Sequence, residues 1–326
     1  MRTSVIIALH NGSDHITEQL ASITGNSRKP DEIVIVDDAS SDDSTQIAQD
    51  HLSNYPDINL VIIRNKHNLG ASISFSSGIL SSTGDILFLS DQDDAWSTNK
   101  IDVIYQYFKS DKDLTMIYSD GSITNKNLAP TGRTIFSTRK HFKNSSGLPR
   151  TPIEIVSNPD IKGCTMALNG NFARRVFRST NSNVFHYWGH DHWVALFAYF
   201  TGHVSEIKEP LLLHRFHDRN TSRAERFSPF SSTIMKRYLS VVGNQPKDFL
   251  SQRYSVVLQH IAIMGVKPKQ EFLDALTKLK YIANERETLR ERPFIQRIRE
   301  ALRLRRQGAY APFNGWFTLL RDVLLR

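Results

Sequence analysis

Four short apolar segments recur at even spacing in the N-terminal part of the chain. They lie near residues 4–9, 32–36, 60–63 and 85–89 and are rich in Ile, Val and Leu. A continuous apolar run of this length, without alternating polar positions, is typical of a strand buried on both faces of a sheet. We therefore expect four continuous buried strands here.

Helical patterns fill the gaps between these strands. Ser13 can cap a first helix and Gly25 can end it. The apolar positions of that helix share one face, at Ile16, Leu20 and Ile23. Further helices fit residues 44–52 and 71–82. Because strand, helix and strand alternate, the pattern predicts a doubly wound α/β half-domain over residues 1–110.

The pattern becomes weaker after this half-domain. Residues 111–158 contain many turn signals, such as Asp120-Gly121, so we expect a loop-rich stretch there. Order returns over 163–216, with a strand expected at 164–168, a helix at 191–200 and a strand at 211–215. From residue 229 onward the pattern is helical, notably over 270–292 and 294–306.

The composition is that of a folded protein. Of 326 residues, 40% are hydrophobic and 23% are charged, which allows one large domain and a smaller one. The single cysteine, Cys164, cannot form an internal disulfide, so we expect a reducing compartment and a packing role for this side chain. The apolar run at 5–9 is too short for a signal peptide, and no apolar run is long enough to span a bilayer. We expect a cytoplasmic protein, either soluble or peripheral.

The net charge of +8 is unevenly distributed. Residues 1–226 are nearly neutral, with 23 Lys and Arg against 25 Asp and Glu. From residue 229 onward there are 18 basic against 8 acidic residues, a net charge of +10. This asymmetry indicates an anionic partner for the C-terminal region, either nucleic acid or a lipid surface.

Polar residues follow each of the four predicted strands. Parallel α/β sheets bind ligands beyond the carboxyl ends of their strands, so these residues are the candidate site. The four groups are His10-Asn11-Gly12, Asp37-Asp38, Arg64-Asn65 with Asn68-Leu69-Gly70, and Asp91-Gln92-Asp93-Asp94.

The last group has three carboxylates within four residues. They repel one another unless they share a cation, so the group predicts a divalent metal site. An isolated acidic pair of this kind would more often be a turn that caps the next helix. The position of this group after the fourth strand of a parallel set favours the metal.

Asp37 and Asp38 also have two interpretations. The acidic residues that follow them can simply cap a helix. Capping does not explain two acids at the very end of a strand, where a carboxylate can accept hydrogen bonds from a nucleotide base or a ribose. The chain has neither G-x-G-x-x-G after the first strand nor G-x-x-x-x-G-K-[ST], which disfavours a dinucleotide oxidoreductase and a P-loop NTPase.

Together these runs resemble the nucleotide-sugar domain of the family 2 inverting glycosyltransferases. The runs are S-V-I-I-A-L-H-N, I-V-I-V-D-D-A-S-S-D-D-S-T, N-L-G-A-S-I-S-F-S-S-G and G-D-I-L-F-L-S-D-Q-D-D-A-W. Two further runs, G-H-D-H-W at 189–193 and L-H-R-F-H-D-R-N at 213–220, extend the resemblance to about residue 220. The D-Q-D-D-x-W variant and the phenylalanine after N-L-G resemble the rhamnosyltransferase-like branch that builds bacterial surface polysaccharides.

The resemblance implies a fold and its domains. We expect a GT-A type, doubly wound, mostly parallel sheet with a helical C-terminal extension. The catalytic domain would cover 1–228, with a nucleotide-sugar half at 1–110 and an acceptor half at 111–228. The basic helical region would cover 229–326.

The resemblance also implies residue roles. Asp38 matches the acid that recognises the nucleotide base, and Asp191 matches the catalytic base. The implied donor-binding positions are Leu9, Asn11, Asp37, Asp38, Asn68, Gly70 and Asp91. The implied ligands of Mg²⁺ or Mn²⁺ are Asp91, Asp93 and His217, although an isolated His after a strand is most often a surface or hydrogen-bonded residue. His10 and His192 depart from the pattern, where aromatic residues are commoner, and this puts the identity of the donor in doubt.

The expected function is transfer of a sugar, L-rhamnose from dTDP-L-rhamnose, to a saccharide acceptor that is carried on a lipid. A cation held by Asp93 would stabilise the leaving diphosphate while Asp191 takes the proton of the acceptor hydroxyl. Asp191 can also cap the helix that follows it, and this would keep the carboxylate ionised. Three alternatives remain: a hexosyltransferase that uses a UDP-sugar, a sugar nucleotidyltransferase, and an inactive carbohydrate-binding relative.

The basic C-terminal region contains an amphipathic segment. Apolar residues recur with helical spacing at Phe294, Ile295, Ile298, Ala301 and Leu302. Arginines occupy much of the remaining circumference, at Arg297, Arg299, Arg303, Arg305 and Arg306. Two interpretations stay open, namely packing on the catalytic domain and docking on the inner face of the cytoplasmic membrane. We expect no nucleic-acid partner, because no recognition motif accompanies the charge.

Overall fold

The computed structural model describes residues 1–138, 151–216, 248–310 and 316–324, which fall into two units. The first unit comprises Met1–Pro149 and Pro159–Asp218, and the second comprises Arg150–Asn158 and Arg219–Arg326. The domain boundary expected at residue 228 lies outside the described residues. Within the described ranges, no helix combines the length and the apolar character needed to cross a membrane.

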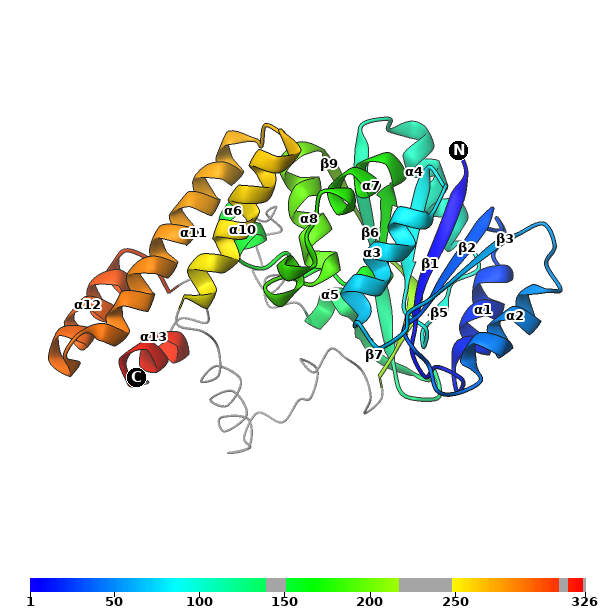
Figure 1. Ribbon diagram of the computed structural model, residues 1–326, viewed down its shortest axis with the longest axis horizontal. Coiled ribbons are helices and arrows are strands. Elements are labelled where there is room, and N and C mark those ends of the chain that lie inside the picture. The colour runs from blue at the N-terminus through cyan, green and yellow to red at the C-terminus, as the bar shows by residue number, and fades with distance from the viewer. Residues whose placement is uncertain (139–150, 217–247, 311–315, 325–326) are drawn as a thin grey trace. The chain divides into compact units, whose positions relative to one another are not determined.

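A mixed sheet forms the centre of the first unit (Figure 1). Its strands are β1 Thr3–Leu9, β2 Glu32–Asp37, β3 Asn59–Arg64, β4 Ile86–Ser90, β5 Ala95–Trp96, β6 Leu114–Thr124, β7 Pro130–Thr134, β8 Met166–Asn169 and β9 His203–Arg215. Among the described residues, these nine strands follow the order β3-β2-β1-β4-β8-β6-β9-β5, with β7 paired to β6. The four N-terminal strands are parallel, while β8 runs antiparallel to β4 and β6, and β9 is parallel to β6. The predicted α/β architecture is confirmed.

Helices cover both faces of the parallel strands. They are α1 Ile16–Thr24, α2 Ser44–Leu52, α3 Ala71–Ser81 and α4 Lys100–Ser110. The odd-numbered residues of β1, such as Val5 and Ile7, share one core with apolar residues of α1, α2 and α4. On the other face α3 packs so closely that a Cβ on Gly78 would lie 2.5 Å from Cγ2 of Ile6. This alternation gives the doubly wound arrangement that the spacing of strands and helices predicts.

The burial of β3 differs from the prediction of a continuous buried strand. Its residues are half-buried or exposed, whereas every residue of β2 and β4 is buried. The reason is position, because β3 is the edge strand of the sheet and has a neighbour on one side only.

The expectation of a loop-rich stretch over 111–158 was wrong for its first part. β6 is an 11-residue strand in the interior of the sheet, with β8 on one side and β9 on the other. Asp120-Gly121, which looks like a turn in the sequence, lies inside this strand where its register with β9 shifts. The carboxylate of Asp120 accepts hydrogen bonds from the backbone amides of Gly121 and Phe136, which satisfies the polar side chain at a buried position.

The rest of the first unit carries shorter elements. They are α5 Ile135–Thr138, the 3₁₀ turn η2 Gly163–Thr165, α7 Gly170–Arg178, the 3₁₀ turn η3 Ser182–His186 and α8 His190–Thr201. η2 leads directly into β8, and α8 leads into β9. Because β8 runs antiparallel to β4, η2 lies on the side of the carboxyl end of β4. The first residues of α8 contact Gly163 of η2 and lie on the same side.

The second unit is helical throughout its described residues. Its elements are α6 Pro152–Ser157, α10 Phe249–Met264, α11 Gln270–Thr288, η5 Leu289–Glu291, α12 Phe294–Arg306 and α13 Trp316–Leu324. Apolar side chains of α11, α12 and α13 form a common core that includes Ile282, Leu304 and Leu319. Next to it Arg286 and Asp322 form a buried ion pair, with Nε and Oδ2 2.7 Å apart. The predicted helical C-terminal region is confirmed.

The faces of α12 differ from the simple division into apolar and basic residues. Arg297 is only 5% exposed, and its guanidinium donates to the backbone oxygens of Val323 and Arg292. Conversely, Ile295 is 73% exposed and Leu302 is 39% exposed. The buried face of α12 therefore contains an arginine, and its exposed face contains apolar residues.

Candidate functional site

The carboxyl ends of β1, β2 and β3 lie level with one another. In the register of the sheet Leu9 is paired with Asp37, and Asp37 with Arg64. Leu9 is fully buried, and its backbone oxygen accepts a hydrogen bond from the amide of Asp38 at 2.8 Å. The polar residues that follow the three strands therefore meet at one edge of the sheet.

Asp38 connects β2 to the loop before α3. One carboxylate oxygen accepts from Nδ2 of Asn65 at 2.7 Å and from the amide of Leu69 at 2.8 Å, and the other accepts from the amide of Gly70 at 2.7 Å. Burial alone would raise the pKa of Asp38, but these hydrogen bonds together lower it. Asp38 is only 3% exposed, so it fixes the loop as an ionised acceptor.

The loop that Asp38 holds includes two more of the expected donor-binding residues. Asn68 is exposed, and its side-chain oxygen accepts from the amide of Gly70 at 3.1 Å. Gly70 has a φ of 86°, a conformation that favours glycine and places its amide toward both acceptors. The loop therefore presents Asn68 at the surface and begins α3 immediately afterwards.

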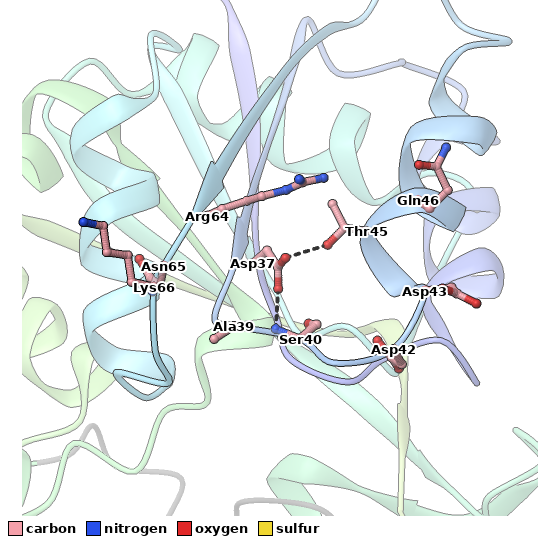
Figure 2. A pocket seen from close by; sticks show the side chains of 10 residues that line it. All are labelled: Asp37, Ala39, Ser40, Asp42, Asp43, Thr45, Gln46, Arg64, Asn65 and Lys66. Atoms are coloured by element: carbon pink, nitrogen blue, oxygen red, sulfur yellow. Dashed lines mark hydrogen bonds between the residues drawn. The ribbon is translucent and has the colours of Figure 1, made fainter.

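A polar pocket of about 450 Å³ opens beside Asp37 (Figure 2). Asp37 is 7% exposed, and its carboxylate accepts from the amide of Ser40 at 2.9 Å and from Oγ1 of Thr45 at 2.8 Å. Arg64 and Asn65 line the same pocket from the end of β3. The pocket thus offers a carboxylate, an amide and a guanidinium at the edge of the sheet.

Asn11 links the loops that follow β1 and β2. Its backbone amide donates to Oγ of Ser40 at 3.1 Å, and its side-chain oxygen accepts from the amide of Ser41 at 2.8 Å. Its φ of 49° is uncommon for a residue with a side chain and is tolerated best by Asn and Asp. Asn11 is therefore part of the scaffold that shapes the site.

The acidic segment after β4 is attached to the loop after β1. Gln92 exchanges two hydrogen bonds with the backbone of His10, of 2.8 Å to the amide and 3.1 Å to the oxygen. Asp91, Gln92 and Asp93 are half-buried, while Asp94 is fully buried. The predicted metal-binding segment thus lies at the same edge of the sheet as Asn11 and Asp37.

The three carboxylates of this segment occupy different environments. Asp94 faces Nδ1 of His214 at 3.0 Å, which lowers the pKa of Asp94 against the effect of burial and raises the pKa of His214 to about 9. Burial, Asp94 and Asp93 together raise the pKa of Asp91 to about 7. The protein's own cation neutralises Asp94, so the repulsion that a metal would relieve concerns Asp91 and Asp93.

Cys164 lies in the same cluster, as the second residue of η2. Among the described residues, Asp91, Asp94, Cys164 and His214 each offer one atom within 4.8 Å of the others. Burial and the two carboxylates raise the pKa of the Cys164 thiol well above its usual value, so the sulfur stays protonated at neutral pH. The hard oxygens of Asp91 and Asp93 instead suit Mg²⁺ or Mn²⁺.

Lys100 is a fully buried cation that the sequence analysis did not single out. Its ammonium group donates to the backbone oxygen of Cys164 at 2.8 Å and lies 4.0 Å from the centre of the Trp96 ring. Burial lowers its pKa to about 8. Lys100 therefore fixes η2 against the segment that follows the acidic residues.

Asp191 lies in the first turn of α8. Its Oδ1 accepts from the amide of His192 at 2.7 Å. Burial would raise the pKa of Asp191, but the charges of His192 and His190 and the amides of His192 and Gly163 lower it. Close packing requires Gly189 before the helix, because a Cβ there would lie 2.6 Å from Oδ1 of Asp191. The carboxylate is thus held ionised, as a general base requires.

η2 connects Asp191 with the acidic cluster. Gly163 contacts Asp191 and His190, and a Cβ on it would lie 3.0 Å from Nε2 of His190. The next residue, Cys164, belongs to the cluster around Asp94. His190 in turn stacks on Phe75 of α3, with ring centroids 4.2 Å apart. The structure therefore brings the expected base, the expected metal segment and the N-terminal part of α3 together.

One expected ligand cannot be placed. His217 lies outside the described residues, directly after Phe216. His214 and Arg215, which precede it, are further site residues that the sequence analysis did not single out. Their signal was the presence of two basic residues at the end of the apolar strand 211–213, in a motif that was otherwise recognised.

The comparison with known families bears directly on this half of the unit. Residues 4–162 match the family described as Glycosyl transferase family 2. The match covers just under half of the chain, and residues 4–162 are thus similar to a family 2 glycosyltransferase domain. The matched range includes every expected site residue of the parallel strands and ends directly before η2.

Relatives of the glycosyltransferase domain are distant. An uncharacterized glycosyltransferase of Nostoc sp. is 30% identical over 110 residues, which cover 34% of this chain and 34% of that protein. The UDP-Glc:alpha-D-GlcNAc-diphosphoundecaprenol beta-1,3-glucosyltransferase WfaP of Escherichia coli is 26% identical over 193 residues, covering 56% of this chain and 74% of WfaP. The chain spans about a third of the length of the first of these relatives.

Solved structures share the fold over a longer range. The mannosyltransferase PcManGT of Pyrobaculum calidifontis, in complex with GDP-Man and Mn²⁺, superposes with a TM-score of 0.55 at 16% identity. The superposition covers 99% of this chain and 85% of PcManGT. The expected GT-A type fold is thus confirmed.

Proposed function

We propose that this protein is an inverting, metal-dependent glycosyltransferase that acts on a bacterial surface glycan. The observation that carries the proposal is the convergence of Asp91, Asp93 and Asp191 at the carboxyl ends of the parallel strands. A nucleotide sugar fits this edge, with its base near the pocket beside Asp37 and Asp38 and its diphosphate near the acidic segment. The family 2 domain over residues 4–162 supports the reaction class.

The chemistry follows from the state of each carboxylate. Asp91 and Asp93 are the residues that would hold a divalent cation, which supplies positive charge beside the leaving diphosphate. Asp191 accepts the proton of an acceptor hydroxyl while that oxygen bonds to the anomeric carbon. The bond from the anomeric carbon to the diphosphate breaks in the same step, so the configuration inverts. A lowered pKa keeps Asp191 ready to accept the proton at neutral pH.

Two donors are candidates. The D-Q-D-D-A-W run favours dTDP-L-rhamnose, whereas the likeness to WfaP, whose name specifies UDP-Glc, favours a UDP-hexose. WfaP also acts, by its name, on a diphosphoundecaprenol acceptor, and this supports a lipid-linked saccharide acceptor here.

We further propose that α12 docks on an anionic lipid bilayer at the cytoplasmic face of the membrane. Four exposed positions of α12 form one stripe, at Ile295, Arg299, Leu302 and Arg306. Apolar side chains between arginines suit the boundary between anionic headgroups and acyl chains. An enzyme whose acceptor is carried on a lipid would benefit from such a contact.

A donor panel tests the reaction. Purified protein is incubated with Mn²⁺, an undecaprenyl-diphosphate sugar acceptor and one of dTDP-L-rhamnose, UDP-glucose, UDP-galactose or UDP-N-acetylglucosamine, and the released nucleoside diphosphate is measured. We expect release with one donor, complete loss with a chelator and recovery when Mn²⁺ is restored. Release that persists in the chelator would contradict metal dependence, and absence of release and of binding for every donor would contradict the function.

A further inference from the structure

Arg215 is the last residue of β9 and lies beside the acidic segment. On one side of β9 Arg215 is paired with Thr124 of β6, and on the other side Leu213 is paired with Ala95 of β5. Since β5 begins directly after Asp94, the end of β9 runs past the residues that form the expected metal site. Arg215 is only 3% exposed at this position.

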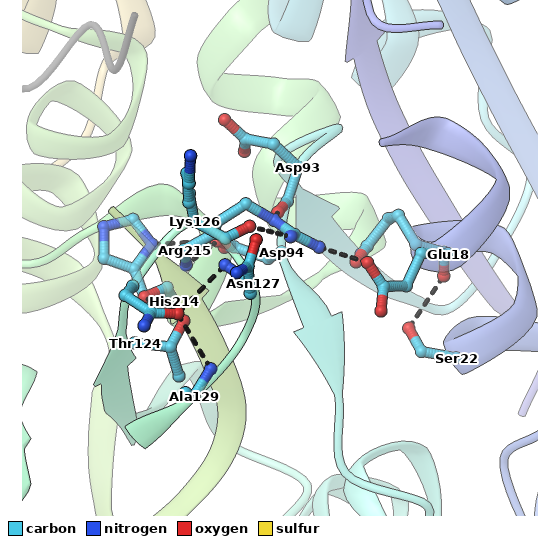
Figure 3. Close-up of polar contacts among 12 residues, drawn as sticks. Glu18, Ser22, Asp93, Asp94, Thr124, Lys126, Asn127, Ala129, His214 and Arg215 are labelled. Carbon is cyan, nitrogen blue, oxygen red and sulfur yellow. Dashed lines mark hydrogen bonds and ion pairs between the residues drawn. The ribbon is translucent and has the colours of Figure 1, made fainter. Parts of the chain in front are cut away.

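The guanidinium group of Arg215 joins three segments of the chain (Figure 3). Its Nε donates to the backbone oxygen of Asp93 at 2.7 Å, and Nη1 donates to the backbone oxygen of Lys126 between β6 and β7. Nη2 forms an ion pair with Glu18 of α1. A planar guanidinium can make these divergent contacts at once, whereas an ammonium group cannot.

Asp94 holds the same strand end from the opposite direction. Its Oδ1 accepts from the backbone amide of Arg215 at 3.0 Å and from the ring of His214 at 3.0 Å. The main chain at Asp93 and Asp94 and the main chain at Arg215 are therefore linked in both directions.

The contact with Asp93 acts on its backbone. Figure 3 shows the carboxylate of Asp93 pointing away from the guanidinium of Arg215, while the backbone oxygen faces it. Fixing the peptide between Asp93 and Asp94 limits the directions in which the Asp93 side chain can leave the main chain. Groups that orient a metal ligand in this way affect metal affinity even though they do not contact the ion.

We propose that Arg215 is a positioning residue that directs the carboxylate of Asp93 toward the cation, by clamping the Asp93 peptide to α1 and to the β6–β7 turn. This inference rests on the metal-dependent function proposed above. It assigns to Arg215 a role in metal affinity in addition to a role in stability.

Binding of Mn²⁺ to the full-length protein, followed by electron paramagnetic resonance with and without UDP or dTDP, tests this role without turnover. We expect Arg215→Ala to weaken Mn²⁺ binding about tenfold, the lower end of the range seen when the partner of a metal ligand is removed. Arg215→Lys should recover part of the affinity, and Glu18→Gln should cause a smaller loss. Arg28→Ala is the matched control, because Arg28 forms an exposed ion pair with Asp102 in the same unit.

The variants separate the possible outcomes. If Arg215→Ala lowers the melting temperature but binds Mn²⁺ as the wild type does, Arg215 is only structural and the inference is overturned. If Arg215→Ala does not fold, Glu18→Gln decides, since the Glu18 side chain is 56% exposed and its substitution spares the core. Mn²⁺ affinity unchanged in Glu18→Gln would then count against the clamp. Wild-type protein that binds no Mn²⁺ under any of these conditions would instead refute the metal-dependent function, and the inference with it.

Discussion

Asp191 is half-buried, yet its carboxylate must stay ionised to accept a proton. A carboxylate in the first turn of α8 benefits from the backbone amides of that turn and from the positive end of the helix dipole. Two neighbouring histidines add further stabilisation of the charged form. The side chain is therefore an ionised acceptor held in a fixed place.

Replacing Asp191 by Asn should separate binding from chemistry. The amide has nearly the same shape but cannot take a proton from the acceptor, so we expect kcat to fall about 10³-fold while donor affinity stays the same. Calorimetry with the nucleotide sugar and steady-state rates at saturating acceptor measure the two effects.

Asp102→Asn serves as the control, because Asp102 is a half-exposed carboxylate on the outer face of α4. Its rate and affinity should match the wild type. An Asp191→Asn enzyme that has lost donor affinity, but turns over normally once saturated, would place Asp191 in donor binding rather than in proton transfer.

At the residue scale, the sequence predicts where the site residues lie on strands and helices better than it predicts their hydrogen-bond partners. It places Asp38, Asp91 and Asp191 at the ends of strands or at the start of a helix, and the structure brings these segments together. It does not reveal that the carboxylate of Asp38 accepts hydrogen bonds from backbone amides of the loop before α3. It also does not reveal that His214 neutralises Asp94. Those pairings join residues 31 to 120 positions apart, and local patterns contain no information about them.

At the scale of elements, α12 offers a test of the proposed membrane contact. Arg299→Gln combined with Arg306→Gln removes two charges from the exposed stripe and leaves the packed face unchanged. Each arginine near an anionic surface contributes roughly 1 kcal/mol, so we expect about 30-fold weaker binding to phosphatidylcholine vesicles that contain phosphatidylglycerol. Vesicle sedimentation at low salt measures the partition.

Lys267→Gln combined with Lys278→Gln provides the matched control. It makes the same change in charge in the second unit, outside α12, and should leave partition unchanged. Equal losses in both double variants would indicate a diffuse charge effect, and no loss in either would rule out α12 as the contact.

Regular elements were predicted well where their patterns are simple. The helices at 44–52 and 294–306 have the predicted bounds, because their apolar spacing and ends are clear in the sequence. β6 was missed because polar residues interrupt its apolar run, and the side chain of Asp120 is satisfied partly by the amide of Phe136 in another segment. A strand in the middle of a sheet can be polar where tertiary contacts permit it.

At the scale of the whole sheet, Glu32 links neighbouring strands at the edge of the sheet opposite the candidate functional site. It is 1% exposed, and its carboxylate accepts from Oγ of Ser4 at 2.5 Å, from Nδ2 of Asn59 at 3.2 Å and from the amide of Thr83 at 2.8 Å. These donors lie on β1, on β3 and just before β4. Burial would raise the pKa of Glu32, yet the hydrogen bonds lower it below 4.5.

Stability should therefore depend on pH through Glu32. A carboxyl group whose folded pKa is lowered contributes stability above its unfolded pKa of 4.5, and this contribution is lost as the pH falls through the folded pKa. We expect Glu32→Gln to cost about 2 kcal/mol at pH 7, because its amide cannot accept from all these donors, and to cost less in acid. Urea unfolding of the wild type and of Glu32→Gln as a function of pH measures this difference in the free energy of unfolding.

The neighbouring carboxylate of Asp31 cannot replace that of Glu32, because it already accepts hydrogen bonds from the backbone amide and the hydroxyl group of Thr3. The control is again Asp102→Asn, whose unfolding curve should follow that of the wild type at each pH. A constant difference between the wild type and Glu32→Gln from pH 7 to pH 3 would show that the cost is steric rather than ionic.

The position of β9 has a consequence for how the protein is made. The hydrogen bond from Arg215 to Asp93 closes a loop of 122 residues, so the acidic segment leaves the ribosome long before its clamp exists. The strands β1 to β4 are already synthesised by then, whereas β8 and β9 must still be synthesised to complete the sheet. A nascent chain therefore carries Asp91-Gln92-Asp93-Asp94 before Arg215 is available to bind this segment. The proposed clamp on the acidic segment can therefore form only after residue 215 has been synthesised.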